Sequence, residues 1–229
     1  MKLRLVKRRT FWCPTSLGTL CILLLLSVPV IWWWCRGESF LSLNRRLPAE
    51  VLVVEGWIGR EGVRAAAKEF DQRGYQYVVA AGGPTTDRWD KDPSSYAEIA
   101  GRELIQLGVP EDRIIIAPAR KTERQRTYES AVAVWRALQA KGVHPKALNF
   151  FTLGPHARRT RLVAAKVYGS GAEIGVVDWV RSADAAELWW QSSERAKDLI
   201  AETVGYFFEV VLNSGRSSNS PNLKNSQIN

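Results

Sequence analysis

Residues 51–81, VLVVEGWIGREGVRAAAKEFDQRGYQYVVAA, decide the fold class. Two β-branched runs, at 51–55 and 77–81, enclose a segment of helical period near 60–73. This order is typical of a βα unit in a parallel sheet. The alternation continues, with strands predicted at 113–118, 147–153 and 173–179 and helices near 94–107, 125–141 and 156–168. The sequence therefore predicts an α/β fold, a three-layer α/β/α domain with a mostly parallel, Rossmann-like sheet.

The C-terminal part is predicted to form one more long helix, at about 185–212. Its apolar stripe is expected to pack on the sheet. A membrane-surface role for GYFFEVVL, at 205–212, is the alternative. The polar segment 214–229 has few large apolar groups and is expected to be disordered.

The N-terminal part contains a predicted transmembrane anchor. Residues 15–35, TSLGTLCILLLLSVPVIWWWC, carry no charge, and about 20 residues of helix cross a hydrocarbon core of roughly 30 Å. Tryptophans stand near both ends, as is typical of membrane interfaces. A cleavable signal peptide is the alternative, but bulky indoles occupy the place where a small-residue cleavage site is needed. We expect an uncleaved anchor.

The charge distribution predicts how the anchor is oriented. The formal net charge is +9, and five of the basic residues lie within the N-terminal segment 1–14. The positive-inside rule places this segment in the cytoplasm. A linker at 36–48 and an extracytoplasmic or periplasmic domain at 49–213 then follow. The chain is thus expected to be a single-pass protein of the plasma (inner) membrane. Because the charge excess is local and the predicted topology faces outward, no nucleic-acid partner is expected.

The cysteine and acidic residues exclude several chemistries. The cysteines Cys13, Cys21 and Cys35 all lie in or beside the span. A disulfide framework, thiol catalysis and a cysteine zinc site in the globular part are therefore excluded. The acidic loop 87–92 is interpreted as solvated. The sequence predicts no metal site and identifies no cofactor.

The loops that leave the strands hold the candidate site residues. In open α/β sheets, ligands bind beyond the carboxyl ends of the strands. The stretch GPHARR at 154–159 places arginines in a first helical turn, where they oppose the helix dipole unless an anion is bound. His156 is therefore predicted to be a proton or hydrogen-bond donor beside an Arg159 clamp. The alternative is a capping histidine with solvated arginines.

Other loop residues are weaker candidates. The basic run at 119–127 is expected to direct Arg124 or Arg126 into the same crevice, although such runs are usually solvated. Glu98 lies in a first helical turn, where a capping role is as plausible as a catalytic one. Gly82 and Gly83 permit a tight turn but do not match a nucleotide-binding motif.

The ordered motifs VLVVEGW, AAGGP, SSYAEIA, LGVPEDRI, RTYESA and TLGPHARRTR resemble the YdcF/SanA/ElyC-like domain-of-unknown-function family of bacterial envelope proteins. The resemblance covers about residues 50–180 and implies a barrier-related, peptidoglycan or surface-polysaccharide role. The positions that match the family's pocket-lining motifs are Gly82, Gly83, Glu98, Thr127, Glu129, His156 and Arg159. The chain departs from the family pattern at 55–57, where relatives have a glycine-rich turn, and at Ser130, where relatives have asparagine.

Together these observations predict a membrane-anchored domain that acts in cell-envelope biogenesis. Its expected ligand is an anionic small molecule or lipid-linked intermediate, a phosphate-bearing glycan or lipid carrier. If the protein is an enzyme, it is expected to be a phosphoryl or glycosyl-phosphate hydrolase or transferase. His156 would then be the general acid or base, Arg159 and Arg126 would stabilise charge, and Glu98 or Glu55 would orient a nucleophile. The alternative is a non-catalytic binding or scaffolding module.

Overall fold

The domain is built on a five-stranded, all-parallel sheet, which confirms the predicted α/β class. The computed structural model describes residues 14–85, 94–122, 124–181 and 187–212. The strands are β1 (Val51–Glu55), β2 (Tyr77–Gly82), β3 (Ile114–Pro118), β4 (Ala147–Leu153) and β5 (Glu173–Trp179). Their order across the sheet is β3-β2-β1-β4-β5.

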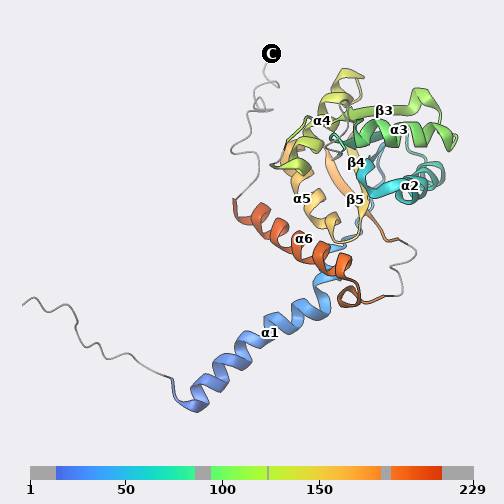
Figure 1. Cartoon of the computed structure of the whole chain (residues 1–229). Coiled ribbons are helices and arrows are strands. Elements are labelled where there is room, and N and C mark those ends of the chain that lie inside the picture. The colour runs from blue at the N-terminus through green and yellow to red at the C-terminus, as the bar shows by residue number, and fades with distance from the viewer. Residues whose placement is uncertain (1–13, 86–93, 123, 182–186, 213–229) are drawn as a thin grey trace, which may run out of the picture. The chain divides into compact units, whose positions relative to one another are not determined.

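Helices cover both faces of the sheet (Figure 1). The connecting helices are α2 (Gly59–Arg73), α3 (Tyr96–Gln106), α4 (Arg126–Ala140) and α5 (His156–Tyr168), with the 3-10 turns η1 (Gly56–Ile58) and η2 (Glu111–Arg113). One core cluster joins the sheet to α2 and α3, and a second joins it to α4 and α5. The three-layer α/β/α architecture is therefore as predicted.

The central strand β1 shows why its sequence is continuously apolar. All five of its residues are buried. Val51 and Val53 belong to the core cluster on the α4 and α5 side, whereas Leu52 and Val54 belong to the opposite cluster. A strand that is covered on both faces needs apolar side chains on both.

The strand order reverses next to β1. The chain first adds β2 and β3 on one side of β1, and then crosses over to place β4 and β5 on the other. The carboxyl ends of β1 and β4 therefore flank the topological switch point, where ligands bind in open α/β sheets.

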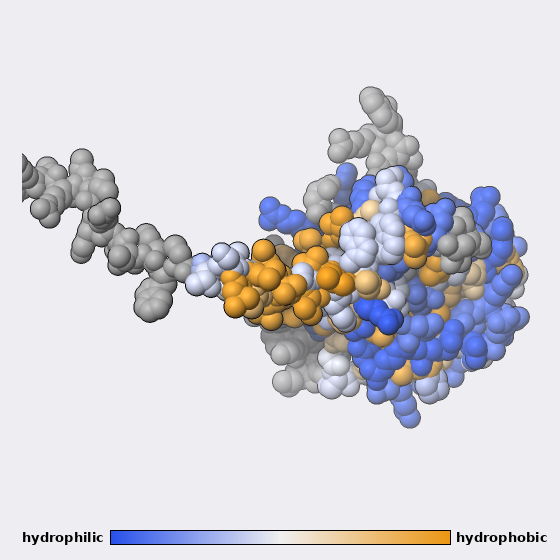
Figure 2. Space-filling model, turned by 90° about the horizontal axis from the view of Figure 1, so that it is seen from below, coloured by the Kyte–Doolittle hydropathy of each residue, from blue (hydrophilic) through white to orange (hydrophobic). Residues whose placement is uncertain are grey.

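The N-terminal helix α1 (Ser16–Leu41) is, among the described residues, the one helix long and apolar enough to cross a membrane. Its side chains form a continuous hydrophobic surface, whereas much of the domain surface is hydrophilic (Figure 2). The chain divides into two compact units, one ending at Gly37 and one beginning at Glu38.

The expected linker at 36–48 is largely part of the domain, which begins at Glu38 rather than at residue 49. Leu41 is fully buried. Arg45 exchanges two backbone hydrogen bonds with Val176 of β5, both of 2.8 Å. Backbone hydrogen bonds hold this segment on the domain. Because they do not depend on residue type, the amino-acid composition does not reveal them.

The last helix differs from its prediction. α6 (Ser193–Leu212) begins later than expected, after the 3-10 turn η4 (Trp189–Gln191). It packs on α5 (Figure 1), and Ile200 and Val204 of the predicted core stripe are 61% and 65% exposed. The expectation that this stripe packs on the sheet is therefore wrong. Leu199 is buried, and two glutamates of α6 pair with cations on α5.

Three sequence predictions fall on residues outside the described ranges. They concern the basic N-terminal segment at 1–13, the acidic residues Asp87, Asp90 and Asp92, and the C-terminal tail from residue 213.

Candidate functional site

A buried polar cluster occupies the switch point. Glu55, the last residue of β1, is 4% exposed. Its carboxylate accepts a hydrogen bond from the hydroxyl of Thr152, near the end of β4, and one of 3.3 Å from the hydroxyl of Thr160 in α5. The carboxylate therefore ties β1 to both β4 and the helix that follows it.

His156, the first residue of α5, lies between two carboxylates. Its Nε2 atom is 3.5 Å from Oε2 of Glu55, and its Nδ1 atom is 2.9 Å from Oε1 of Glu202. The Trp57 ring meets the imidazole edge-on, with ring centroids 5.0 Å apart. Nη2 of Arg159 is also 3.1 Å from Nδ1, so a guanidinium N–H and a carboxylate oxygen both face this nitrogen, and its donor or acceptor role depends on the tautomer.

Arg159 lies one turn further along α5 and also contacts Glu202. Its Nε donates to Oε2 at 2.7 Å and its Nη2 donates to Oε1 at 2.9 Å. Its Nη1 donates to the hydroxyl of Thr127 in α4 at 3.0 Å. This two-point geometry is the strong form of an arginine–carboxylate pair. His156 and Arg159, which the sequence predicts to act together, share Glu202 as a partner.

Burial and neighbouring charges act in opposite directions on Glu202 and Arg159. Burial alone would raise the pKa of Glu202, but the charge and hydrogen bonds of His156 and Arg159 outweigh it and hold that pKa well below its usual range. Burial opposes the charge of Arg159, yet its bonds to Glu202 raise the pKa of the guanidinium. The carboxylate of Glu202 therefore neutralises the positive charge of Arg159.

Glu202 is the cluster member that sequence reasoning missed. It comes from α6, 46 residues after His156. The sequence does contain a signal for this contact. Glu202 and Glu209 are acidic residues within an apolar helical segment, and they are two helical turns apart. Acidic residues on the same face of an apolar helix indicate a polar partner.

A second ion pair fixes how α6 lies on α5. Nζ of Lys166 is 3.0 Å from Oε2 of the buried Glu209. Both partners lie seven residues beyond the Arg159–Glu202 pair, so the two helices run in the same direction. Gly205 stands between the two glutamates, where a Cβ atom would be 3.0 Å from Nε of Arg159. The lack of a side chain at Gly205 thus leaves room for the guanidinium of Arg159.

The remaining predicted residues on β2 and α3 have local roles. The exposed Glu98 forms a capping box with Ser95, its carboxylate accepting from the Ser95 amide at 2.8 Å. These bonds hold the pKa of Glu98 below its usual range. A Cβ atom at Gly82 would be 2.7 Å from that of Tyr96, so the glycine permits close approach of α3, while Gly83 accepts the Tyr96 amide bond at 2.9 Å. Of the two roles left open for Glu98, the structure supports capping.

The residues after β3 are divided between the cluster and the surface. Thr127 contacts Arg159, as described above. Glu129 is buried and accepts a hydrogen bond of 2.6 Å from Arg120. Arg126 begins α4 and is exposed, as is Arg124. The structure thus gathers Glu55, Thr127, His156 and Arg159 around Glu202, but not Glu98.

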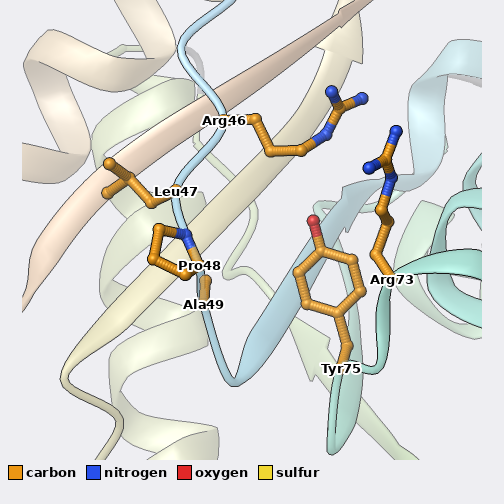
Figure 3. Close-up of a pocket in the computed structure, with 6 residues that line it drawn as sticks. All are labelled: Arg46, Leu47, Pro48, Ala49, Arg73 and Tyr75. Atoms are coloured by element: carbon orange, nitrogen blue, oxygen red, sulfur yellow. The ribbon is translucent and has the colours of Figure 1, made fainter.

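Two cavities lie away from the cluster. The first, of about 240 Å³, is at the amino edge of the sheet, where Arg46, Arg73 and Tyr75 line it (Figure 3). Arg46 and Tyr75 both donate to Glu69, so these groups are already paired. The second, of about 410 Å³, is lined by the end of β3 and one side of α4, including Arg120 and Glu129. Neither is lined by His156 or Arg159, so the expected common pocket of His156, Arg126, Gly83 and Glu98 is not among them.

The residue types of the cluster are those used in proton transfer. Among the described residues, no three histidine, cysteine or acidic side chains are grouped as metal ligands would be. A histidine with a carboxylate on each nitrogen can take up a proton at one and release it at the other.

Comparison of the chain with protein-family models, curated proteins and solved structures gives no match. The resemblance to the YdcF/SanA/ElyC-like family therefore stays a prediction from its motifs.

Proposed function

We propose that the protein is a membrane-anchored, extracytoplasmic α/β protein that binds a phosphate-bearing glycan or lipid-carrier intermediate of the bacterial cell envelope. The observation that carries the proposal is the location of the Glu55–His156–Arg159 cluster. Buried titratable groups at the switch point of a parallel sheet are where this fold class binds and converts its ligands. α1 supplies the anchor, and the motif resemblance supplies the envelope context.

The exposed cations around this edge favour an anionic ligand. Lys121, Arg124 and Arg126 are exposed on the segment that leads from β3 into α4, the helix whose Thr127 contacts Arg159. Basic side chains on one loop raise the local concentration of an anion. A phosphate group bound by Arg126 would lie near the N-terminal end of α4, where the helix dipole also favours it.

As an enzyme, the protein would use His156 and Glu55 for proton transfer. Of the two glutamates expected to orient a nucleophile, Glu55 is kept, because it faces Nε2 of His156, whereas Glu98 caps a helix. The reaction class that fits is phosphoryl or glycosyl-phosphate transfer or hydrolysis. His156 would protonate the leaving oxygen or deprotonate the nucleophile, and the arginines would stabilise phosphate charge.

One observation favours a second candidate, a non-catalytic binding or scaffolding module. Arg159 already has a carboxylate partner in Glu202, and the cluster is mostly buried. An anion can use this guanidinium only by displacing Glu202. In the second candidate the cluster holds α6 in place, and exposed cations such as Arg126 do the binding.

The test measures binding and turnover with the full chain in detergent. A polyprenyl diphosphate is the probe, and release of inorganic phosphate is the activity. Arg126→Ala should weaken binding by about tenfold, the loss of one charge-assisted contact. Arg113→Ala removes an exposed cation at the opposite edge of the sheet and should leave binding unchanged. Absence of binding, or equal losses in both variants, contradicts the proposal; binding without phosphate release selects the non-catalytic module.

A further inference from the structure

Apart from the buried Leu199, α6 carries its large apolar side chains on its outer side, unlike an ordinary surface helix. Its inner side carries Glu202 and Glu209, which pair with Arg159 and Lys166 of α5. Its outer side carries an apolar stripe at the helical spacing of four, four and three residues. The stripe consists of Ile200, Val204, Phe208 and Val211, which are 61%, 65%, 45% and 70% exposed. An apolar stripe on the outside is typical of a helix with an apolar partner.

The segment before α6 continues this surface. Leu188 and Trp190, beside and within η4, are 49% and 42% exposed. Tryptophan at the end of an amphipathic helix is typical of membrane interfaces.

α6 contacts the residues that follow the uncharged span in the chain. The last residues of α1 belong to the domain and contact α6: Glu38 accepts a hydrogen bond from Arg195, and the Phe40 ring meets that of Tyr206 edge-on, at 5.6 Å. Only two residues separate Cys35, the last residue of the uncharged span, from Glu38. Because an extended chain covers at most about 3.6 Å per residue, the Cα atoms of Cys35 and Glu38 are no more than about 11 Å apart.

We infer that the outer face of α6, formed by Ile200, Val204, Phe208 and Val211, docks on the lipid surface of the membrane that α1 crosses. The occupant is the acyl and headgroup boundary, because the stripe is apolar, tryptophans precede it in η4, and only two residues separate the uncharged span from the domain that carries it. The inference rests on the proposed membrane anchor and not on the proposed ligand.

Spin labels on the full chain test this inference. The native cysteines Cys13, Cys21 and Cys35 are replaced by serine, and single cysteines are introduced by Val204→Cys and Phe208→Cys. Leu24→Cys, in α1, is the control for the anchor. Ile99→Cys and Ile105→Cys, on α3, are matched controls, since these residues are 41% and 43% exposed. The protein is reconstituted in vesicles of phosphatidylethanolamine and phosphatidylglycerol.

The readout is the collision rate of each label with oxygen, which concentrates in lipid, and with a water-soluble nickel complex. Labels at 204 and 208 should favour oxygen as the label at 24 does, whereas labels at 99 and 105 should favour nickel. Water-like labels at 204 and 208 beside a lipid-like label at 24 overturn the docking and leave the anchor standing. A water-like label at 24 overturns both. Protection that increases with the protein-to-lipid ratio, with spin–spin broadening, identifies a second copy as the occupant and also overturns the inference.

Discussion

The carboxylate of Glu202 accepts two hydrogen bonds from the guanidinium of Arg159, of 2.7 and 2.9 Å, and lies 2.9 Å from Nδ1 of His156. α6 is thus held on α5 through the same side chains that form the candidate site. Substitutions in this cluster are therefore expected to change stability, and the variants below are chosen to separate that effect from any effect on binding.

Arg159→Ala should destabilise the domain. The sequence suggests an exposed first-turn arginine whose loss is harmless, but its removal leaves the buried Glu202 without its cation. Breaking a buried pair in this way lowers the free energy of unfolding by about 3–5 kcal/mol. The double variant Arg159→Ala/Glu202→Gln should recover part of this loss, as measured by urea unfolding of the detergent-solubilised chain. A single variant as stable as the wild type would show that the pair is not formed.

Substitution of His156 separates the two candidate functions. His156→Gln removes the proton-exchanging ring while it keeps a side chain that can hydrogen-bond Glu202. In an enzyme, phosphate release should fall by on the order of a hundredfold with binding of the diphosphate retained. In a binding module, there is no turnover to lose. Thermal unfolding of the same preparation provides the control, because a large drop in its midpoint would assign the loss of activity to misfolding.

Gly205→Ala should lower stability, against the usual effect of this substitution in a helix. Alanine is favoured over glycine by about 1 kcal/mol in a helix interior. At Gly205, however, the added Cβ atom would be 3.0 Å from Nε of Arg159, whose guanidinium is fixed by Glu202 and Thr127. We expect a net loss of about 1 kcal/mol in urea unfolding. The same change in an Arg159→Ala background should be neutral or stabilising; a loss of equal size there would locate its cause outside this contact.

Asp178, in β5, predicts a pH dependence. Burial raises the pKa of its carboxyl from 3.8 to about 6, and the nearby Glu38 adds to this. Its Oδ1 atom has no hydrogen-bond partner within the described part of the chain. Because the folded state binds the proton more tightly than the unfolded state, stability should fall as pH rises from about 4 to about 6 and stay lower above that.

Asp178→Asn should remove this dependence and stabilise the domain at pH 7 by about 2 kcal/mol, because no charged carboxylate is then buried. Urea unfolding from pH 4 to 8 is the measurement. Parallel pH profiles of variant and wild type would contradict the assignment.

The sheet could be predicted from the sequence because each strand is a separate apolar run. The strands predicted at 147–153 and 173–179 match the structure to the residue, since both are bounded by polar or turn residues. His156 and Arg159 could be placed at the carboxyl edge for the same reason. Their partner Glu202 could not be predicted, because its contact depends on which side of α6 packs on α5. The assumption that the apolar stripe is buried leads to the wrong side of that helix.

The central position of β1 has a consequence for how the chain matures on the ribosome. β1 pairs with β2 and with β4, and β4 begins at Ala147, about a hundred residues after β1. At about 5–20 residues per second, translation delivers β4 roughly 5–20 s after β1. During this interval the half-sheet β1–β2–β3 presents an unpaired edge of β1, a template for incorrect strand pairing. Arrival of β4 closes that edge, and the nascent chain is most exposed to misassembly until then.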